Sequence, residues 1–282
     1  MTTKSSPTRA HEHVLEIAAT PEVVWKTITE ADELVRWFPL GAKVRPGKGG
    51  EILYRWGELE GRCRILEWQP PRHLGTGWME APSAEAKAPD FPRSTTGDEA
   101  ARAALAVDWY LEGKGGSTVL RLVHSGFDRG AQWDKEYDGT KRGWTFELQA
   151  LKHYLEHQRG KERRATWIRQ TTALEPAAVW ERFMKPGPIF RKVALDSLGA
   201  GDRYRFVREG GEVLEGRVLV NHPPLEFAGT LANHGDGMLR FGFEDCMGGP
   251  EAHVWFATWG TSAEEFEDLE GRWRKTLASA FG

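Results

Sequence analysis

A single histidine, His124, is the residue of this sequence best placed to do chemistry. It lies in the segment TVLRLVHSGF, where it alternates with Leu120 and Leu122. Because every second side chain of a β-strand points to the same face, His124 should point into the interior together with the two leucines. An imidazole there could donate a proton to a bound ligand, or take one from it, near neutral pH. A core histidine that hydrogen-bonds to the backbone fits the same pattern.

Tryptophan is the residue in excess, with 13 in a chain of 282 residues. A large ring can fill the wall of a cavity and offer its indole N–H to a ligand oxygen or to another protein group. We therefore predict a ligand cavity around His124, although buried rings of this kind could equally well pack together as core. The predicted ligand-binding residues are Trp37, Trp56, Trp78, Leu105, Trp109, Leu120, Leu122, His124, Trp144 and Leu148.

The other candidate residues and motifs do not indicate a second functional site. Arg62 and Arg64 share one face of a strand and could clamp an anion, but we predict that they face solvent because an unpaired buried charge is costly. His11 and His13 have the spacing of metal ligands, yet no set of cysteines or carboxylates completes a tetrahedral site. We predict that His153 and His157, which also have metal-ligand spacing on the closing helix, face solvent because they lie on the side opposite Leu148, Leu151 and Leu155. We also predict that the protein uses no metal and no cofactor. The sequence holds no nucleophile elbow, phosphate-binding loop or dinucleotide fingerprint.

The elements that must position these residues occur twice in the chain. Residues 59–74, LEGRCRILEWQPPRHL, return at 214–227 as LEGRVLVNHPPLEF, and Thr20-Pro21 with Trp25 returns at the same offset as Glu175-Pro176 with Trp180. Two matching segments that are separated by the same number of residues indicate a duplicated unit. We predict two domains, residues 1–160 and residues 161–282, of which the second is more divergent. A segment rich in Ala, Pro, Ser and Thr, residues 81–101, should be a mobile loop inserted in the first domain.

Hydrophobic periodicity predicts the same order of elements in both copies. A strand precedes a helix that starts at a proline, antiparallel strands follow, and a long amphipathic helix closes the unit. The closing helix of the first copy is expected over residues 143–157. In the second copy it should begin at Ser262, with Glu265 in capping-box spacing.

The two copies differ at the position of His124. Alignment through Gly126 and Gly260 puts Thr258 there. A function that depends on His124 would therefore belong to the first copy alone. Also in the second copy, the segment His234-Gly235-Asp236-Gly237 predicts a turn.

This order of elements, with the segments ATPEVVWKTIT, GRCRILEWQPPRHL, STVLRLVHSGF and GWTFELQALKHYL, resembles the START-related helix-grip superfamily (SRPBCC). Within it the chain is most similar to the branch related to the C-terminal domain of the heat-shock-protein-90 ATPase activators. The resemblance covers nearly all of the first copy and, more loosely, the second. It implies an α+β, START/Bet v 1-like fold, present twice, in which a curved antiparallel sheet clasps a long C-terminal helix. Relatives hold lipids, aromatic polyketides, hormones or nothing known between sheet and helix, so the fold alone does not give the function.

Composition and charge narrow the possible partners and the compartment. The net charge of −3 provides no basic face for nucleic acid or for an anionic membrane surface. The two cysteines lie far apart, and no apolar run is long enough for a signal peptide or a membrane span. We therefore expect a reduced, cytoplasmic protein.

Three functions remain open. The first, which we favour, is a soluble binding protein for a small hydrophobic or aromatic molecule in the cavity of the first domain. The second is an enzyme of the cyclase or hydrolase type, in which the cavity orients the substrate and His124 shuttles a proton. The third, implied by the family resemblance, is a co-chaperone-like protein partner of an ATPase. We expect binding rather than catalysis.

Overall fold

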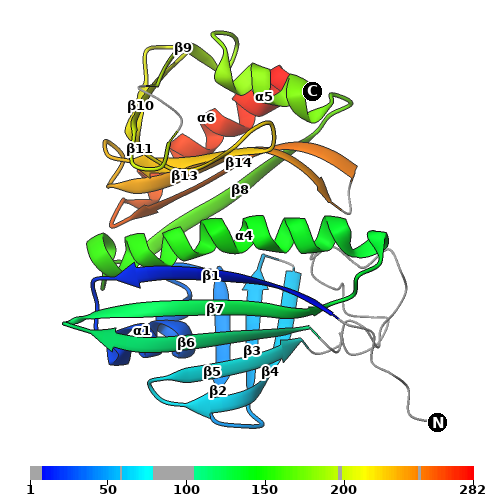
Figure 1. The fold of residues 1–282 in the computed structure, drawn as a ribbon. Coiled ribbons are helices and arrows are strands. Elements are labelled where there is room, and N and C mark those ends of the chain that lie inside the picture. Colours follow the sequence, from blue (N-terminus) through cyan, green and yellow to red (C-terminus); the bar gives the residue numbers. More distant parts are fainter. Residues whose placement is uncertain (1–7, 58, 79–104, 196–198, 247–248) are drawn as a thin grey trace. The chain divides into compact units, whose positions relative to one another are not determined.

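The computed structural model describes residues 8–57, 59–78, 105–195, 199–246 and 249–282. The chain divides into two compact units, Met1–Arg159 and Gly160–Gly282. Each unit contains a seven-stranded antiparallel sheet and a long C-terminal helix (Figure 1). The α+β fold predicted in two copies is thus confirmed, whereas the predicted loop over residues 81–101 lies outside the described residues. None of the described helices is both long enough and apolar enough to cross a membrane.

The sheet of the first unit has the strand order β1-β7-β6-β5-β4-β3-β2. Its strands are β1 (Arg9–Ile17), β2 (Gly41–Arg45), β3 (Glu51–Trp56), β4 (Leu59–Gln69), β5 (His73–Trp78), β6 (Ala106–Lys114) and β7 (Ser117–Phe127). Its helices are α1 (Pro21–Thr29), α2 (Ala31–Leu34) and α4 (Asp134–His153), with a 3₁₀ turn at Ala131–Trp133 and a π turn at Tyr154–Gln158. In Figure 1, β3 and β4 run across the direction of β1 and β7, so the sheet is strongly curved.

The inner face of this sheet packs against α4. Along β7, buried residues alternate with partly exposed ones, and His124 is buried on the same face as Leu120 and Leu122, as predicted. Trp144 of α4 meets Trp109 of β6 edge to face, with 5.3 Å between the ring centroids. The closing helix therefore lies against the sheet, as a helix-grip fold requires. On the other face of the sheet, Arg62 and Arg64 are exposed, which confirms their predicted orientation.

The helix α4 is longer than predicted. It begins at Asp134, well before the expected start at Gly143. Its first half, DKEYDGTKRG, is polar and contains two glycines, so it lacks the apolar stripe by which an amphipathic helix is found in a sequence. This polar half nevertheless carries residues that contact the site described below.

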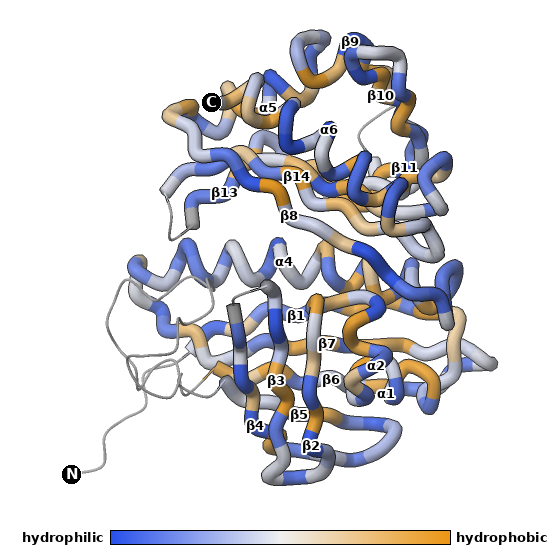
Figure 2. The backbone as a smooth tube through the Cα atoms, turned by 180° about the vertical axis from the view of Figure 1, so that it is seen from behind, coloured by the Kyte–Doolittle hydropathy of each residue, from blue (hydrophilic) through white to orange (hydrophobic). Residues whose placement is uncertain are grey.

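The second unit repeats this arrangement, with the strand order β8-β14-β13-β12-β11-β10-β9. Its strands are β8 (Arg163–Thr171), β9 (Phe190–Leu195), β10 (Arg203–Arg208), β11 (Val213–His222), β12 (Glu226–Leu231), β13 (Gly237–Cys246) and β14 (Gly249–Trp259). Its helices are α5 (Pro176–Met184) and α6 (Ala263–Phe281). Figure 2 shows hydrophobic residues recurring between hydrophilic ones along the strands of both units, as expected for sheets with one buried face.

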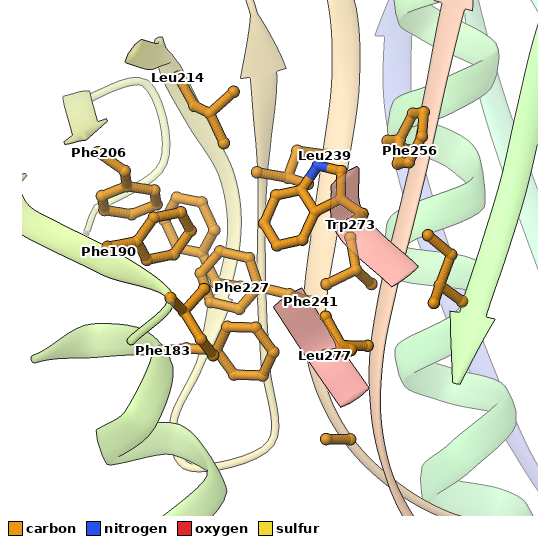
Figure 3. Packing of buried hydrophobic residues seen from close by; sticks show 14 of the residues in the cluster. Phe183, Phe190, Phe206, Leu214, Phe227, Leu239, Phe241, Phe256, Trp273 and Leu277 are labelled. Carbon is orange, nitrogen blue, oxygen red and sulfur yellow. The ribbon is translucent and has the colours of Figure 1, made fainter. Parts of the chain in front are cut away.

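Phenylalanine rings fill the interior of the second unit (Figure 3). Phe241 stacks on Phe183 and on Phe227, with centroid separations of 4.5 and 5.0 Å. Trp273 of α6 completes this cluster from the helix side and meets Phe190 edge to face at 6.1 Å. The space between sheet and helix in this unit is therefore occupied by its own aromatic side chains.

Two short predictions for the second unit are confirmed. Residues 232–236 form a turn between β12 and β13, in which Asp236 has a positive φ of 48°. At the start of α6, the Glu265 amide donates to Ser262 Oγ over 3.2 Å, and the Ser262 amide donates to Glu265 Oε2 over 3.1 Å. This reciprocal capping box fixes where α6 begins.

Candidate functional site

The candidate site centres on His124, whose side chain is 3% exposed on the inner face of β7. The indole Nε1 of Trp144, on α4, donates a hydrogen bond to His124 Nδ1 over 3.2 Å. The other ring nitrogen of His124, Nε2, is buried and has no hydrogen-bond partner among the described residues. One nitrogen of this imidazole is thus satisfied and the other is available.

The bond from Trp144 sets the tautomer of His124. An indole N–H can only donate, so His124 Nδ1 must accept and cannot carry a proton. The neutral ring then carries its proton on Nε2. His124 therefore presents an N–H donor, without a partner, inside the apolar region between β7 and α4.

The surroundings of His124 keep its ring uncharged. Burial, followed by the nearby His11 and His13, lowers the pKa of His124 from 6.5 to about 3. A general acid or base works best with a pKa near the operating pH. At neutral pH His124 is suited to donating a hydrogen bond rather than to moving a proton, so its burial disfavours the proton shuttle, one of the alternatives that the sequence leaves open.

His11 lies directly opposite His124 in the pairing of β1 with β7. The two imidazoles meet edge to face with 5.2 Å between centroids, and His11 is 4% exposed. His11 is therefore buried rather than solvated. Of the two histidines predicted to face solvent on the closing helix, His157 is exposed, but the prediction is wrong for His153, which is buried. β1 is an edge strand, but α4 covers its inner face at this point, and Thr140 of α4 contacts the His11 ring.

A short chain of hydrogen bonds leads outward from His11. The Thr140 hydroxyl donates to the carbonyl of Glu136 over 2.8 Å, which leaves its oxygen to accept from His11 Nε2 at 3.2 Å. His11 Nδ1 then accepts from Nε2 of the half-buried His13 at 3.2 Å. Burial, followed by His13 and Lys141, lowers the pKa of His11 to about 4. Although three histidines lie close together, the described residues contain no group of His, Cys, Asp or Glu arranged to hold a metal ion.

The predicted lining residues fall into two aromatic groups on either side of His124. In the first group, Phe38 lies among Tyr54, Trp56 and Trp144, with centroid separations of 5.4, 5.3 and 5.7 Å. Trp37, which precedes it, meets Trp109 at 6.2 Å. Phe38 was not among the predicted site residues, because nothing in the sequence distinguishes it from an ordinary core residue.

The second aromatic group surrounds Phe127 at the end of β7. Leu105, Phe127 and Trp133 form a buried cluster, and Trp78 packs against it. Phe127 contacts His124, with 4.6 Å between ring centroids. Of the remaining predicted residues, Leu120, Leu122 and Leu148 are all buried in the first unit. Whether these residues bind a ligand stays a prediction, since in this structure many of the rings pack on one another.

Residues 18–156, which include His124 and Trp144 but not His11 and His13, match the family model described as Activator of Hsp90 ATPase homolog 1-like protein. The first unit thus contains a domain similar to this Hsp90 ATPase activator-like family. The match ends within the π turn that follows α4, so the family model covers the first unit only. The resemblance stated from the sequence is confirmed at the level of this domain.

Solved structures provide further similarities. The Aha1 dimer from Colwellia psychrerythraea is similar over 53% of this chain and 97% of its own, with 17% identity and a TM-score of 0.43. The di-domain ARO/CYC BexL from the BE-7585A biosynthetic pathway is similar over 96% of this chain and 97% of its own, with 19% identity and a TM-score of 0.40. CalU16 from Micromonospora echinospora is similar over 53% of this chain and 78% of its own, with 21% identity and a TM-score of 0.38. At these levels of similarity no substrate or activity transfers to this chain.

No curated protein matches the chain at a significant level.

Proposed function

We propose that the Hsp90 ATPase activator-like domain binds a small hydrophobic or aromatic molecule between its sheet and α4. In this proposal an oxygen of the ligand accepts a hydrogen bond from His124 Nε2. The main support for the proposal is the state of the His124 ring. Its Nδ1 accepts a hydrogen bond from Trp144, while its Nε2 has no partner among the described residues.

The chemistry of the ligand follows from that donor and its surroundings. A buried N–H without a partner costs free energy, which a ligand acceptor recovers. The neighbouring rings of Phe127 and Trp144 favour an apolar and preferably aromatic body. A ketone or phenol oxygen attached to an aromatic ring satisfies both requirements.

Room for the ligand would come from the displacement of Phe38. This residue follows α2, outside any regular element, and is only half-buried, while its ring contacts Tyr54 of β3 and Trp144 of α4. A side chain held by ring contacts at the edge of the core can rotate at a lower cost than one in a closed core. Its departure would open the space beside Trp144 and give access to His124.

Calorimetric titration with two compounds of similar shape tests this proposal. We expect 2-acetonaphthone, which has a carbonyl oxygen, to bind about 3- to 10-fold more tightly than 2-ethylnaphthalene, which has none, since a neutral hydrogen bond contributes about 1 kcal/mol. His124→Phe keeps an aromatic ring and removes the donor, so it should abolish this preference. His73→Phe is the matched control, because His73 Nε2 is bonded to Asp108 at 2.7 Å and lies outside the site. The proposal fails if neither compound binds, or if His124→Phe keeps the preference.

The two alternative functions are supported less well by the site. A proton shuttle at His124 requires a pKa nearer to 7 than the value of about 3 that burial gives this residue. An ATPase partner role has its support in the family description. It would be tested by measuring ATP hydrolysis by heat-shock protein 90 with and without the protein, where an unchanged rate would count against it.

A further inference from the structure

A pocket of about 280 Å³ opens in the second unit, at the end of the sheet where α6 begins. One wall is the turn between β12 and β13, with Asn233 and His234. A second wall is the end of β14 and the segment after it, with Thr258 and Thr261. The first turns of α6 form the third wall. All of these residues belong to one unit, and the pocket borders the buried cluster of the interior, to which Phe266 and Leu269 also belong.

Three polar side chains of this pocket have unsatisfied buried atoms. Thr258 is 1% exposed, and its Oγ1 has no hydrogen-bond partner among the described residues. The same holds for Thr261 Oγ1 and for His234 Nε2. Buried polar atoms are nearly always paired in folded proteins, so three such atoms around one pocket indicate something that binds there. Hydroxyl groups can both donate and accept, and they suit this set of partners.

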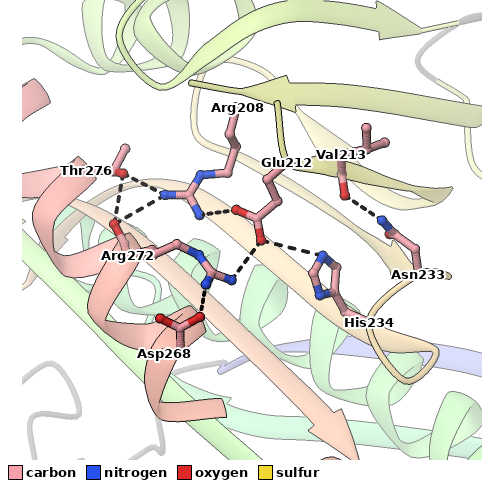
Figure 4. Close-up of polar contacts among 8 residues, drawn as sticks. All are labelled: Arg208, Glu212, Val213, Asn233, His234, Asp268, Arg272 and Thr276. Carbon is pink, nitrogen blue, oxygen red and sulfur yellow. Dashed lines mark hydrogen bonds and ion pairs between the residues drawn. The ribbon is translucent and has the colours of Figure 1, made fainter. Parts of the chain in front are cut away.

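The charges at the rim of the pocket are satisfied by one another (Figure 4). Arg272 is paired with Asp268 and, over 3.1 Å, with Glu212. Glu212 is paired in addition with Arg208 over 2.7 Å and lies 3.7 Å from His234 Nε2. An ionic ligand would have to break one of these pairs. An uncharged ligand would not.

The floor of the pocket is apolar. Phe266 and Leu269, on the side of α6 that faces the sheet, both line it and are both buried. Side chains of this type favour contact with the face of a ring or with a hydrocarbon edge. The pocket therefore combines an apolar floor with a wall of hydroxyl and imidazole groups.

Thr258 occupies the position that His124 occupies in the first unit. The glycines used for the alignment, Gly126 and Gly260, both adopt positive φ angles, of 96° and 71°. Both residues lie opposite an edge strand, Thr258 opposite Arg164 on β8 and His124 opposite His11 on β1. The duplication has thus kept a buried polar side chain at one point of both sheets and changed its type.

From these observations we infer that the second unit has a ligand site of its own, at Thr258, Thr261 and His234, for a small uncharged molecule that has an aromatic ring and hydroxyl groups. The site does not depend on His124. It is distinct from the one proposed for the first unit.

Methyl NMR of the full chain tests this inference, with resorcinol as the probe. Resorcinol should cause saturable shifts of the Thr258 and Leu269 methyl signals, whereas toluene and myo-inositol, which lack the hydroxyls or the aromatic ring, should bind at least several-fold more weakly. Thr258→Val and Thr261→Val should each weaken binding about 3- to 10-fold, as expected for the loss of one hydrogen bond. Thr172→Val is the control, since Thr172 is also buried in the second unit but its hydroxyl accepts from the Leu174 amide.

Three results would overturn the inference. They are the absence of saturable shifts at these methyls, equal binding of toluene or myo-inositol, and unchanged affinity in both threonine variants. His124→Phe should leave the shifts in the second unit unchanged, so failure of the first-unit proposal and failure of this one can be told apart.

Discussion

The indole of Trp144 donates to Nδ1 of His124 over 3.2 Å and thereby joins α4 to β7. The bond has two effects on His124. It holds the imidazole in a fixed orientation, and it places the ring proton on Nε2, which faces no described partner.

Trp144→Phe should allow His124 to adopt either neutral tautomer. The variant keeps a ring on α4 but removes the indole N–H that requires Nδ1 to accept, so both neutral tautomers should be populated. Long-range ¹H–¹⁵N NMR of the imidazole distinguishes them, and the unaltered protein should show the Nε2–H form alone. Trp25→Phe is the control, because Trp25 packs on Trp68 and does not contact His124. A mixture of tautomers in the unaltered protein would contradict this account.

The buried histidines should make the protein less stable in mild acid. The pKa values of His11 and His124 in the folded chain, about 4 and about 3, lie below the unfolded value of 6.5. The unfolded chain therefore binds more protons as the pH falls below 6.5, and each histidine should lower the free energy of unfolding by about 1.4 kcal/mol per pH unit until its folded pKa is reached. Urea unfolding of the unaltered protein and of His124→Phe between pH 7 and pH 4 measures this. The variant should show a shallower slope, and equal slopes would refute the prediction.

Phe38→Ala should open the first unit. Removing this ring takes away its contacts with Tyr54, Trp56 and Trp144. We expect 2-acetonaphthone to associate faster, and the free energy of unfolding to fall by about 1–3 kcal/mol because the side chain is only half-buried. Stopped-flow fluorescence gives the association rate. If association were unchanged or slower, Phe38 would not control access.

Phe241→Ala should destabilise the second unit by about 3–5 kcal/mol, the usual cost of removing a buried phenylalanine ring. Phe241 contacts the rings of Phe183 and Phe227, and none of the three is exposed. Phe241→Leu keeps part of the volume and should cost less. Denaturant unfolding monitored by NMR signals of the second unit measures the loss of stability in both variants. A decrease of less than about 1 kcal/mol in the free energy of unfolding for the alanine variant would contradict the prediction, because it would show that the cluster collapses around the gap.

Ser262→Ala should cost about 1 kcal/mol, since it removes one half of the capping box at the start of α6. Thermal unfolding measures the change. An unchanged midpoint of thermal unfolding would mean that water satisfies the backbone N–H groups at the start of α6 as well as the Ser262 side chain does.

The fold and the inward direction of His124 were predictable because they depend on local patterns. The repeat of residues 59–74 at residues 214–227 indicated the duplication, and alternation along β7 placed His124 beside Leu120 and Leu122. The capping box at Ser262 is likewise a signal of short range. Such features need no knowledge of the partner strand or helix.

The partners of His124 could not be predicted, because they depend on register and on the rotation of α4. The burial of His11 follows from its place opposite His124, and a sequence does not give the pairing of β1 with β7. Thr140 lies in the polar half of α4, where no apolar stripe indicated a helix. The low pKa of His124 results from this assembled environment, so the strand pattern alone suggested a proton shuttle that burial disfavours.

The most direct test of the central claim is the ¹H–¹⁵N signal of His124 Nε2 during titration with 2-acetonaphthone. If the ligand oxygen accepts from this nitrogen, the Nε2 proton should move downfield in a saturable manner and become protected from exchange with solvent, while the signals of Nδ1 and of the Trp144 indole keep the pattern of their hydrogen bond. An Nε2 signal that stays unchanged while the ketone binds would show that His124 is a core residue and that the ligand, if any, is held elsewhere.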